Sequence, residues 1–195
     1  MKEVRYISDN DLKRIRELLA YKDLIVMLNI LNIGVNVALR ISDLLKLKFE
    51  DVKSDNTITV REKKTKKFKT IKLNNTCQQA IKDLKKYYKK EGYKNYSKGY
   101  MFKSQQPQLK VTFQDVPITP YSVGRYLREA REFLAITYPI GTHSFRKTWG
   151  YNVYQKTKDI ALVMKALNHS SPAITLRYIG IEQETLNATY DSIEI

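Results

Sequence analysis

Hydrophobic residues recur at helical spacing near the start of the chain. Ser8 is a candidate N-cap with Asp11 reaching back to it, so a helix is predicted to begin there. The residues expected on its buried face are Leu12, Ile15, Leu18 and Leu19. A second apolar run, Asp23 to Ile33, is expected to form a helix that ends at Gly34, a plausible C-cap.

Short extended segments follow this helical region. Residues 56–60 and 70–73 are alternating or β-branched runs, which are typical of strands. The segment between them, REKKTKKFK, is dense in lysine and contains no glycine. We predict a β-hairpin or β-ribbon with a basic tip, where lysines are usually exposed to solvent.

The middle of the chain returns to helical patterns. Cys77 to Lys90 is predicted as a helix with a row of lysines opposite its apolar face. Residues 100–102 fit a short strand, and Gln105 to Thr119, which contains two prolines, is predicted as a loop. A further helix is expected to start at Thr119–Pro120 and to end before Tyr138.

The stretch from Gly141 to Gly180 predicts three short helices, HSFRKTWGYNVYQKT, DIALVMKALN and SSPAITLRYI. Ser171 is the candidate N-cap of the third, and Pro172 occupies its first helical position. After the break at Gly180, residues 182–193 are predicted to form a short final amphipathic helix. The predicted fold class is therefore mainly α with a small antiparallel β-sheet (α+β).

The balance of charged residues indicates what kind of partner the protein binds. The chain has 195 residues, enough for one domain with a real core or at most two small ones. Its 35 Lys+Arg against 20 Asp+Glu give a formal net charge of +15. Such an excess predicts a polyanionic partner, nucleic acid first. The alternative from charge alone is a basic protein with scattered surface lysines.

Several classes of protein are disfavoured by the composition. Cys77 is the only cysteine, so no intrachain disulfide can form, and with two histidines a zinc site is not expected. Met1 to Asp11 is polar and is not a signal peptide. The longest charge-free run, Leu24 to Leu39, is too short to span a bilayer. We expect a cytoplasmic location.

Arg40 stands alone in apolar sequence, between Leu39 and Ile41. A lone arginine in such a stretch is costly unless it is paired or faces a bound anion. An ion pair with Asp43, three residues later at a helix start, is the local explanation. Binding of an anion is the other.

Three motifs resemble those of the tyrosine recombinases of the phage integrase type. HSFR, with His143 and Arg146, resembles their H-x-x-R motif. LNHSSPAITLRYI, with His169 and Tyr178, resembles their L-G-H-x-x-x-x-x-T-x-x-Y segment. ALRISDL, followed by LKFED, resembles the G-L-R-x-x-E-L and L-x-W-x-D pattern around the first arginine, here Arg40. The resemblance covers the chain from about Leu12 to Tyr190.

A fourth motif concerns the hairpin, where the family places its catalytic lysine. KKTKK resembles the family's K-T-G type of turn, which points to Lys64, while Lys63 and Lys66 remain rivals because the register is open. The sequence departs from the family at Asn168, which replaces a glycine, and at Lys147, which stands where a histidine is frequent. Neither change removes a catalytic group.

The resemblance implies a role for each matched residue in cutting a phosphodiester. Tyr178 is the nucleophile, which attacks the scissile phosphate and forms a 3′-phosphotyrosyl bond. Arg40, Arg146 and His169 hold the phosphate oxygens, since paired arginines neutralise and orient such an anion. The same resemblance implies the fold of the tyrosine recombinase catalytic domain.

Two proton transfers complete the implied mechanism. His143 acts as the base for the tyrosine, and Lys64 protonates the departing 5′-oxygen. No metal or other cofactor is required. Surface lysines and arginines are expected to contact the DNA backbone; the candidates are Lys63, Lys66, Lys67, Arg125, Arg128 and Lys147.

The resemblance also implies partners and domain organisation. Double-stranded DNA is the expected partner, with a homotetramer on DNA and a monomer possible without it. Residues 1–195 are interpreted as one catalytic domain, with a core of residues 1–180 and a tail helix, residues 181–195, that is exchanged between protomers. The family's additional N-terminal core-binding domain is not expected within this sequence.

The leading hypothesis is a site-specific recombinase or integrase that acts in integration or excision of a phage or transposon. A type IB topoisomerase-like enzyme is the enzymatic rival. A DNA-binding regulator that keeps the fold without cutting is the rival from another class.

Overall fold

The computed structural model describes residues 3–181, 188 and 190–193. Its helices are α1 (Asp9–Tyr21), α2 (Ile25–Val37), α3 (Ile41–Leu44), α4 (Asn75–Lys90), α5 (Pro107–Val111), α6 (Pro120–Phe133), α7 (Thr142–Thr157), α8 (Ile160–Leu167) and α9 (Pro172–Ile179), with a 3₁₀ turn at Phe49–Asp51. The strands are β1 (Thr57–Arg61) and β2 (Phe68–Lys72), which pair antiparallel. The predicted fold class, mainly helical with a small antiparallel sheet, is confirmed.

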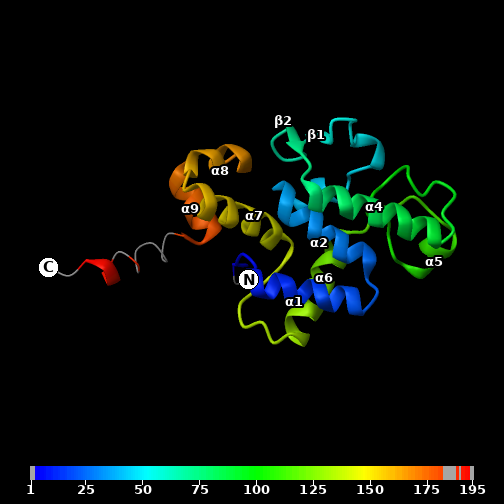
Figure 1. The fold of residues 1–195 in the computed structure, drawn as a ribbon, viewed down its shortest axis with the longest axis horizontal. Coiled ribbons are helices and arrows are strands. Elements are labelled where there is room, and N and C mark those ends of the chain that lie inside the picture. The colour runs from blue at the N-terminus through cyan, green and yellow to red at the C-terminus, as the bar shows by residue number, and fades with distance from the viewer. Residues whose placement is uncertain (1–2, 182–187, 189, 194–195) are drawn as a thin grey trace.

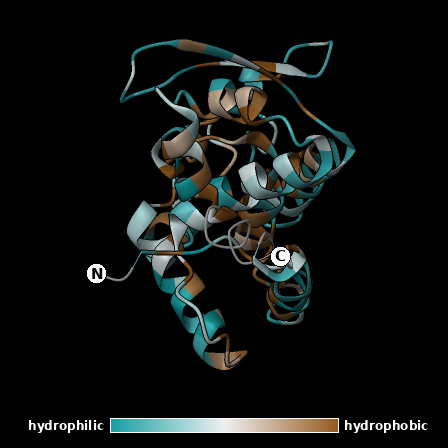
Figure 2. Cartoon of the chain, turned by 90° about the vertical axis from the view of Figure 1, so that its left-hand side faces the viewer, coloured by the Kyte–Doolittle hydropathy of each residue, from teal (hydrophilic) through white to brown (hydrophobic). Residues whose placement is uncertain are grey.

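Helix α2 is the centre of the main core and packs against α1, α4 and α7 (Figure 1). Nine of its thirteen residues are buried, which requires apolar side chains around most of its circumference. Its neighbours α1 and α4 are amphipathic helices, and hydrophobic and hydrophilic residues occur within the same helical ribbons (Figure 2). Burial of the apolar faces of α1 and α4 against α2 therefore stabilises this part of the fold.

A second, smaller cluster joins the C-terminal helices. Helices α8 and α9 pack against each other and against α7, at the opposite end of the molecule from α5 (Figure 1). The buried residues of this cluster are Ala38, Val163, Leu167, Ile179 and Ile181. Because Ala38 directly follows α2, this cluster places α8 and α9 beside the end of the central helix.

The hairpin lies above α2 and turns one face toward the body of the protein (Figure 1). Ile58 pairs with Ile71, and both are buried. Val60 pairs with Lys69 two residues further along, so these side chains share the inward face. The register thus directs Lys69 toward the protein interior.

Most of the predicted element boundaries are confirmed. Ser8, Thr119 and Ser171 cap α1, α6 and α9, each accepting a backbone hydrogen bond from the residue three positions later. The four residues expected on the buried face of the first helix are buried. Gly180 ends α9 in a left-handed conformation.

The prediction that Gly34 ends the second helix is wrong, since α2 continues to Val37 and ends at Ala38, a left-handed residue with φ of 53°. A Cβ atom on Gly34 would lie 2.7 Å from Cδ2 of Phe145 and 3.1 Å from a methyl of Leu44. The glycine therefore serves the close approach of α2 to α7 rather than helix termination.

The central loop region also differs from the prediction. Residues 107–111 form the short helix α5 within the segment predicted as a loop, with Pro107 at its first turn. Residues 100–102 form no strand; Tyr100 makes only an isolated bridge to Lys48. The predicted helix at residues 182–193 lies mostly outside the described residues, so the division of the chain at residue 180 stays a prediction.

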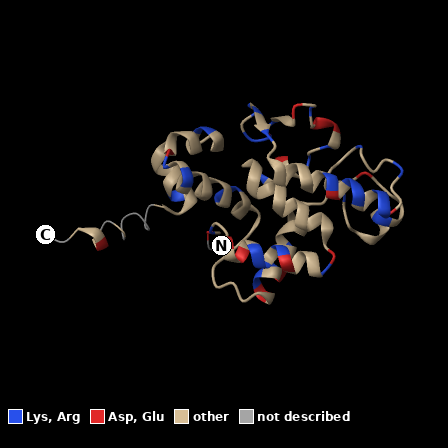
Figure 3. Ribbon diagram, in the orientation of Figure 1, with Lys and Arg blue, Asp and Glu red and all other residues tan. Residues whose placement is uncertain are grey.

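Lys and Arg residues occur over the hairpin, α4 and the α7–α9 unit (Figure 3). None of the described helices is long and apolar enough to cross a membrane. Nor do the described residues contain a cluster of three or more His, Cys, Asp or Glu side chains arranged to hold a metal ion.

Candidate phosphate-binding site

Two arginines from distant parts of the sequence meet at one buried carboxylate, Glu62 at the end of β1. Arg40 occupies the N-cap position of α3, and its Nη1 lies 3.0 Å from Oε1 of Glu62. Arg146 of α7 places its own Nη1 3.8 Å from the same oxygen. The motif arginines are therefore neighbours, as the resemblance required, and they share an anionic partner that the sequence analysis did not identify.

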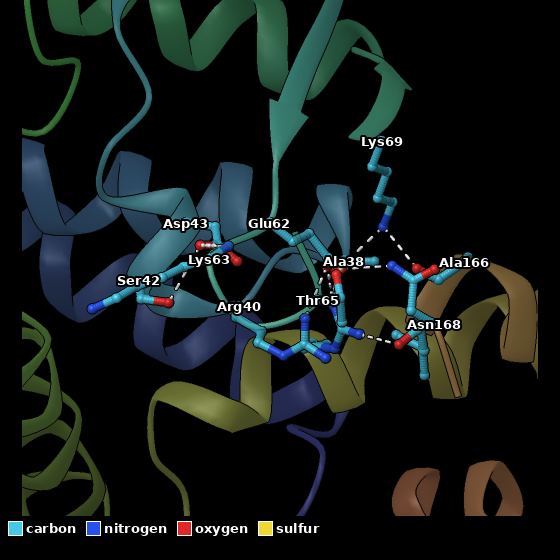
Figure 4. A network of polar contacts seen from close by, with 12 residues as sticks. Ala38, Arg40, Ser42, Asp43, Glu62, Lys63, Thr65, Lys69, Ala166 and Asn168 are labelled. Carbon is cyan, nitrogen blue, oxygen red and sulfur yellow. Dashed lines mark hydrogen bonds and ion pairs between the residues drawn. The ribbon is translucent and has the colours of Figure 1, made fainter. Parts of the chain in front are cut away.

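Glu62 is held by further hydrogen bonds (Figure 4). The hydroxyl of Thr65 and the side-chain amide of Asn168 both donate to its Oε2, at 2.7 and 2.6 Å. Burial alone would raise the pKa of Glu62, but these donors and the two arginines lower it below its usual value. Glu62 is thus an ionised, fully buried anchor that joins the hairpin to the turn after α8.

The local alternative of an Arg40–Asp43 ion pair is wrong. Arg40 pairs with Glu62, and Asp43 instead accepts a hydrogen bond from the backbone N–H of Lys63 at 3.1 Å. Asp43 thereby ties α3 to the start of the hairpin turn. The signal for Glu62 was present as the one carboxylate in the basic segment, but its partners lie too far away in sequence to be read locally.

Arg146 is almost completely buried, and its guanidinium donates to two main-chain carbonyls, those of Ala38 and Leu167. Ala38 ends α2 and Leu167 is the last residue of α8. Arg146 thus joins the segment that carries Arg40 to the segment that carries His169.

His169 follows the left-handed residue Asn168, which ends α8. Its Nδ1 lies 3.2 Å from the Thr175 hydroxyl, which itself donates to the Ser171 carbonyl at 2.9 Å. Since the hydroxyl proton is already used, Nδ1 is the donor to Thr175 and Nε2 is left for another partner. Burial, with the charges of Arg146 and Arg40, lowers the pKa of His169 to about 4.

Tyr178 packs edge-on against His169, with ring centroids 4.9 Å apart and the planes at 82°. Its hydroxyl is buried and makes no hydrogen bond within the part of the chain that the structure describes. Burial raises the pKa of Tyr178, although the charges of Arg146 and Arg40 oppose that shift. The result is a protonated hydroxyl that lies beside two guanidinium groups and forms no well-aligned hydrogen bond with the described residues.

His143 and Lys64 lie at the edge of this cluster. His143 is the second residue of α7 and is exposed; desolvation by neighbouring groups, followed by the charge of Arg146, lowers its pKa. Lys64 is exposed in the hairpin turn, and its charge contributes to that lowering. His143 also lines a hollow of about 360 Å³ together with Arg128 and Arg131.

Lys69 is a member of this site that the motifs did not indicate. Its ammonium donates to the Ala166 carbonyl at 2.8 Å and to the Ala38 carbonyl at 3.4 Å. Burial and then the charge of Arg146 lower its pKa to about 8. The available signal was strand alternation, which places Lys69 on the same face as the apolar Ile71.

The predicted DNA-contacting residues divide into two groups. Exposed side chains belong to Lys63, Lys66, Lys67, Arg125 and Arg128. Lys147, by contrast, is buried, with its ammonium 2.6 Å from a carboxylate oxygen of Glu3 and 4.9 Å from the ring centre of Tyr178. The structure thus places Lys147 behind the nucleophile candidate rather than on the surface.

The sequence profile of the phage integrase family matches residues 5–184. The probable integrase/recombinase YoeC of Bacillus subtilis is 41% identical over 157 residues, which cover 80% of this chain and 78% of YoeC. The tyrosine recombinase XerC of Caldanaerobacter subterraneus is 30% identical over 162 residues, which cover 80% of this chain but only 42% of XerC.

Solved structures show the same fold at lower identity. The XerA recombinase superposes with a TM-score of 0.73 at 21% identity, covering all of this chain and 68% of XerA. The XerH site-specific recombinase, in a post-cleavage complex with its difH substrate, gives 0.72 at 19% identity, covering 98% of this chain and 54% of XerH.

Proposed function

The chain belongs to the phage integrase family, and we propose that it is the catalytic part of a site-specific DNA recombinase that cuts and rejoins strands through Tyr178. The observation that carries this proposal is the buried Tyr178 hydroxyl, which lies beside Arg40 and Arg146 without a well-aligned hydrogen bond to the described residues. A buried polar group without a partner is costly unless a ligand completes it. A phosphodiester fits, since it brings an electrophile to the hydroxyl and an anion to the guanidinium groups.

The first step is binding of the scissile phosphate. Arg40 and Arg146 neutralise its non-bridging oxygens, and His169 turns its free Nε2 toward it. The phosphate charge offsets the two arginines and raises the pKa of His169, so that Nε2 becomes a donor. Glu62 keeps the guanidinium groups in place by pairing with both before DNA arrives.

The second step is transfer of the phosphoryl group to tyrosine. His143 removes the proton of Tyr178, the phenolate oxygen bonds to phosphorus, and the bond to the 5′-oxygen breaks. Lys64 gives that oxygen its proton. A 5′-hydroxyl from another strand then reverses these steps, so strands exchange without external energy.

Duplex DNA and further copies of the chain are the proposed partners. XerH is bound to its difH substrate, and a lambda integrase tetramer is bound to a Holliday junction, in structures with this fold. By analogy, this chain is proposed to act on DNA in the cytoplasm as a tetramer, in integration or excision of a mobile element. The exposed cations of the hairpin and α6 are the proposed backbone contacts.

A denaturing gel distinguishes cutting from mere binding. The probe is a labelled library of nicked duplexes with a randomised segment, because a nick lets the cleaved strand diffuse away and traps the covalent intermediate. An adduct that survives denaturation supports the recombinase. DNA binding without any adduct would favour the non-cleaving regulator. A topoisomerase-like enzyme would form the same adduct, so a separate assay on supercoiled plasmid is needed; relaxation without strand exchange would favour that enzyme.

DNA affinity is expected to fall steeply with salt. A protein of net charge +15 that neutralises several phosphates releases their counterions. With six or more contacts, affinity drops about 10³-fold or more between about 50 and 200 mM salt. Binding isotherms over a salt series measure the slope, and a nearly flat plot of log affinity against log salt contradicts the proposed interface.

DNA binding is also expected to take up a proton at His169. The pKa of about 4 in the free protein rises when a phosphate faces the ring. Affinity therefore increases as the pH falls through the raised pKa, because protonation then favours the bound state. Titrations at constant ionic strength measure this effect. The His169→Gln variant should show a weaker pH dependence, and identical dependence in both proteins contradicts the assignment.

A further inference from the structure

We propose that Lys69 is a positioning residue of the phosphate site, which ties the main chain beside Arg40 to the end of α8 and so holds Arg146 and His169 in register. The inference rests on the proposed function and deepens it, since it adds a residue to the same site. Lys69 acts through other groups, because its ammonium donates hydrogen bonds to main-chain carbonyls of the described residues.

The geometry places Lys69 between two segments that carry site residues (Figure 4). Its Nζ donates to the Ala166 carbonyl at 2.8 Å, three residues before His169, and to the Ala38 carbonyl at 3.4 Å, two residues before Arg40. One side chain from the hairpin thus bridges α2 and α8. The strand register makes this possible, because Lys69 pairs with Val60 on the inward face.

Lys69 and Arg146 together close the C-terminal end of α8. Both side chains donate to the Ala38 carbonyl. On the helix, Lys69 donates to the Ala166 carbonyl and Arg146 donates to the Leu167 carbonyl. The last carbonyls of a helix lack partners within it and carry partial negative charge, which favours cations there. The two cations therefore fix the point from which Asn168 and His169 leave the helix.

The charged groups around Lys69 explain why its protonation matters. It faces Arg146 from α7, Arg40 from the α2–α3 connection and Glu62 from the end of β1, while α8 presents main-chain carbonyls. Burial and the two arginines lower the pKa of Lys69 to about 8, although Glu62 opposes the shift. Lys69 is thus a cation at neutral pH and loses its proton just above it.

The test compares three variants by single-turnover adduct formation on the nicked-duplex library. Lys69→Met removes the ammonium, and Lys69→Arg keeps a permanent cation. Lys72→Met is the matched control, since Lys72 lies on the same strand with an exposed side chain.

We expect Lys69→Met to lower the cleavage rate at saturating DNA about 10²-fold, the cost of misplaced catalytic groups, with DNA affinity changed only a few-fold. Lys69→Arg should restore most of the rate, and Lys72→Met should match the parent protein.

The pH profile separates positioning from a general loss of structure. In the parent protein, the cleavage rate divided by Kd reports groups of the free protein, so it should fall as the pH rises through about 8. In the Lys69→Arg variant this ratio should not fall over the same pH range, because a guanidinium keeps its proton. Lys64 and Tyr178 are present in both proteins and do not create the difference.

Three outcomes would overturn the inference. Lys69→Met could cleave as fast as Lys72→Met, or Lys69→Arg could fail to restore the rate and leave the pH profile unchanged. The third outcome is that the Lys69→Met variant recovers its cleavage rate on DNA with sulfur in place of the bridging 5′-oxygen. That result would identify Lys69 as a proton donor. Failure of the proposed function appears separately, as absence of adduct with the parent protein, and removes the basis of the inference as well.

Discussion

Replacing Tyr178 by phenylalanine is expected to abolish the covalent protein–DNA adduct while DNA affinity stays within a few-fold. The ring contacts with His169 and with the ammonium of Lys147 remain, and only the reactive oxygen is lost. Denaturing gels measure the adduct, and binding isotherms measure the affinity. Tyr154→Phe, on α7, serves as the matched control and should cut normally.

The same substitution is informative about stability. The Tyr178 hydroxyl is buried without a hydrogen-bond partner, so its removal leaves no group unsatisfied. The Phe variant should therefore melt at the same temperature as the parent protein or higher. If the Phe variant still formed adduct, another tyrosine, such as Tyr151 or Tyr190, would have to be the nucleophile.

Replacing Lys64 by alanine is expected to lower adduct formation by about 10² to 10⁴, the usual contribution of a general acid. An alkoxide leaves slowly without a proton, and a lysine in an exposed turn can reach the bridging 5′-oxygen. A substrate with sulfur at that position no longer needs the proton, because a thiolate leaves unprotonated. Lys64→Ala should regain most of its activity on this substrate.

Two comparisons make the Lys64 experiment decisive. Arg146→Ala should not recover on the sulfur substrate, because the phosphate charge stays uncompensated. Lys63→Ala and Lys66→Ala test the register of the hairpin, since both were rivals in the motif. If one of these variants recovers activity on the sulfur substrate and Lys64→Ala does not, the proton donor is that residue. If none of the lysine variants recovers, the proton donor is His143 or water.

The sequence was sufficient for features that depend on neighbouring residues. Apolar periodicity and caps such as Ser8 and Ser171 predicted the longer helices, whereas the short helix α5 lies in a segment predicted as a loop. The motifs indicated Arg40 and Arg146, which the fold brings to one carboxylate. The prediction for Gly34 is wrong because a glycine after an apolar run is typical of a helix end, whereas this glycine is required by the close approach of the Phe145 side chain on α7.

The parts of the site that sequence could not supply depend on contacts between distant segments. Glu62 and Asn168 are more than a hundred residues apart, and nothing local to either predicts their hydrogen bond. That contact gives a structural reason for Asn168 in place of the family's glycine: the residue keeps the left-handed backbone and adds a donor for Glu62. The sequence did not predict a role for Lys69, because the register of the hairpin decides whether a strand lysine faces solvent or the core. That register cannot be read from the sequence alone.

The most direct test is to identify the residue that becomes attached to DNA. Adduct from the parent protein on the nicked-duplex library is digested with protease and nuclease, and the nucleotide-bearing peptide is sequenced by mass spectrometry. The proposed function predicts a nucleotide linked through its 3′-phosphate to Tyr178. A link to any other residue, or no adduct under conditions in which the protein binds the DNA, would contradict it.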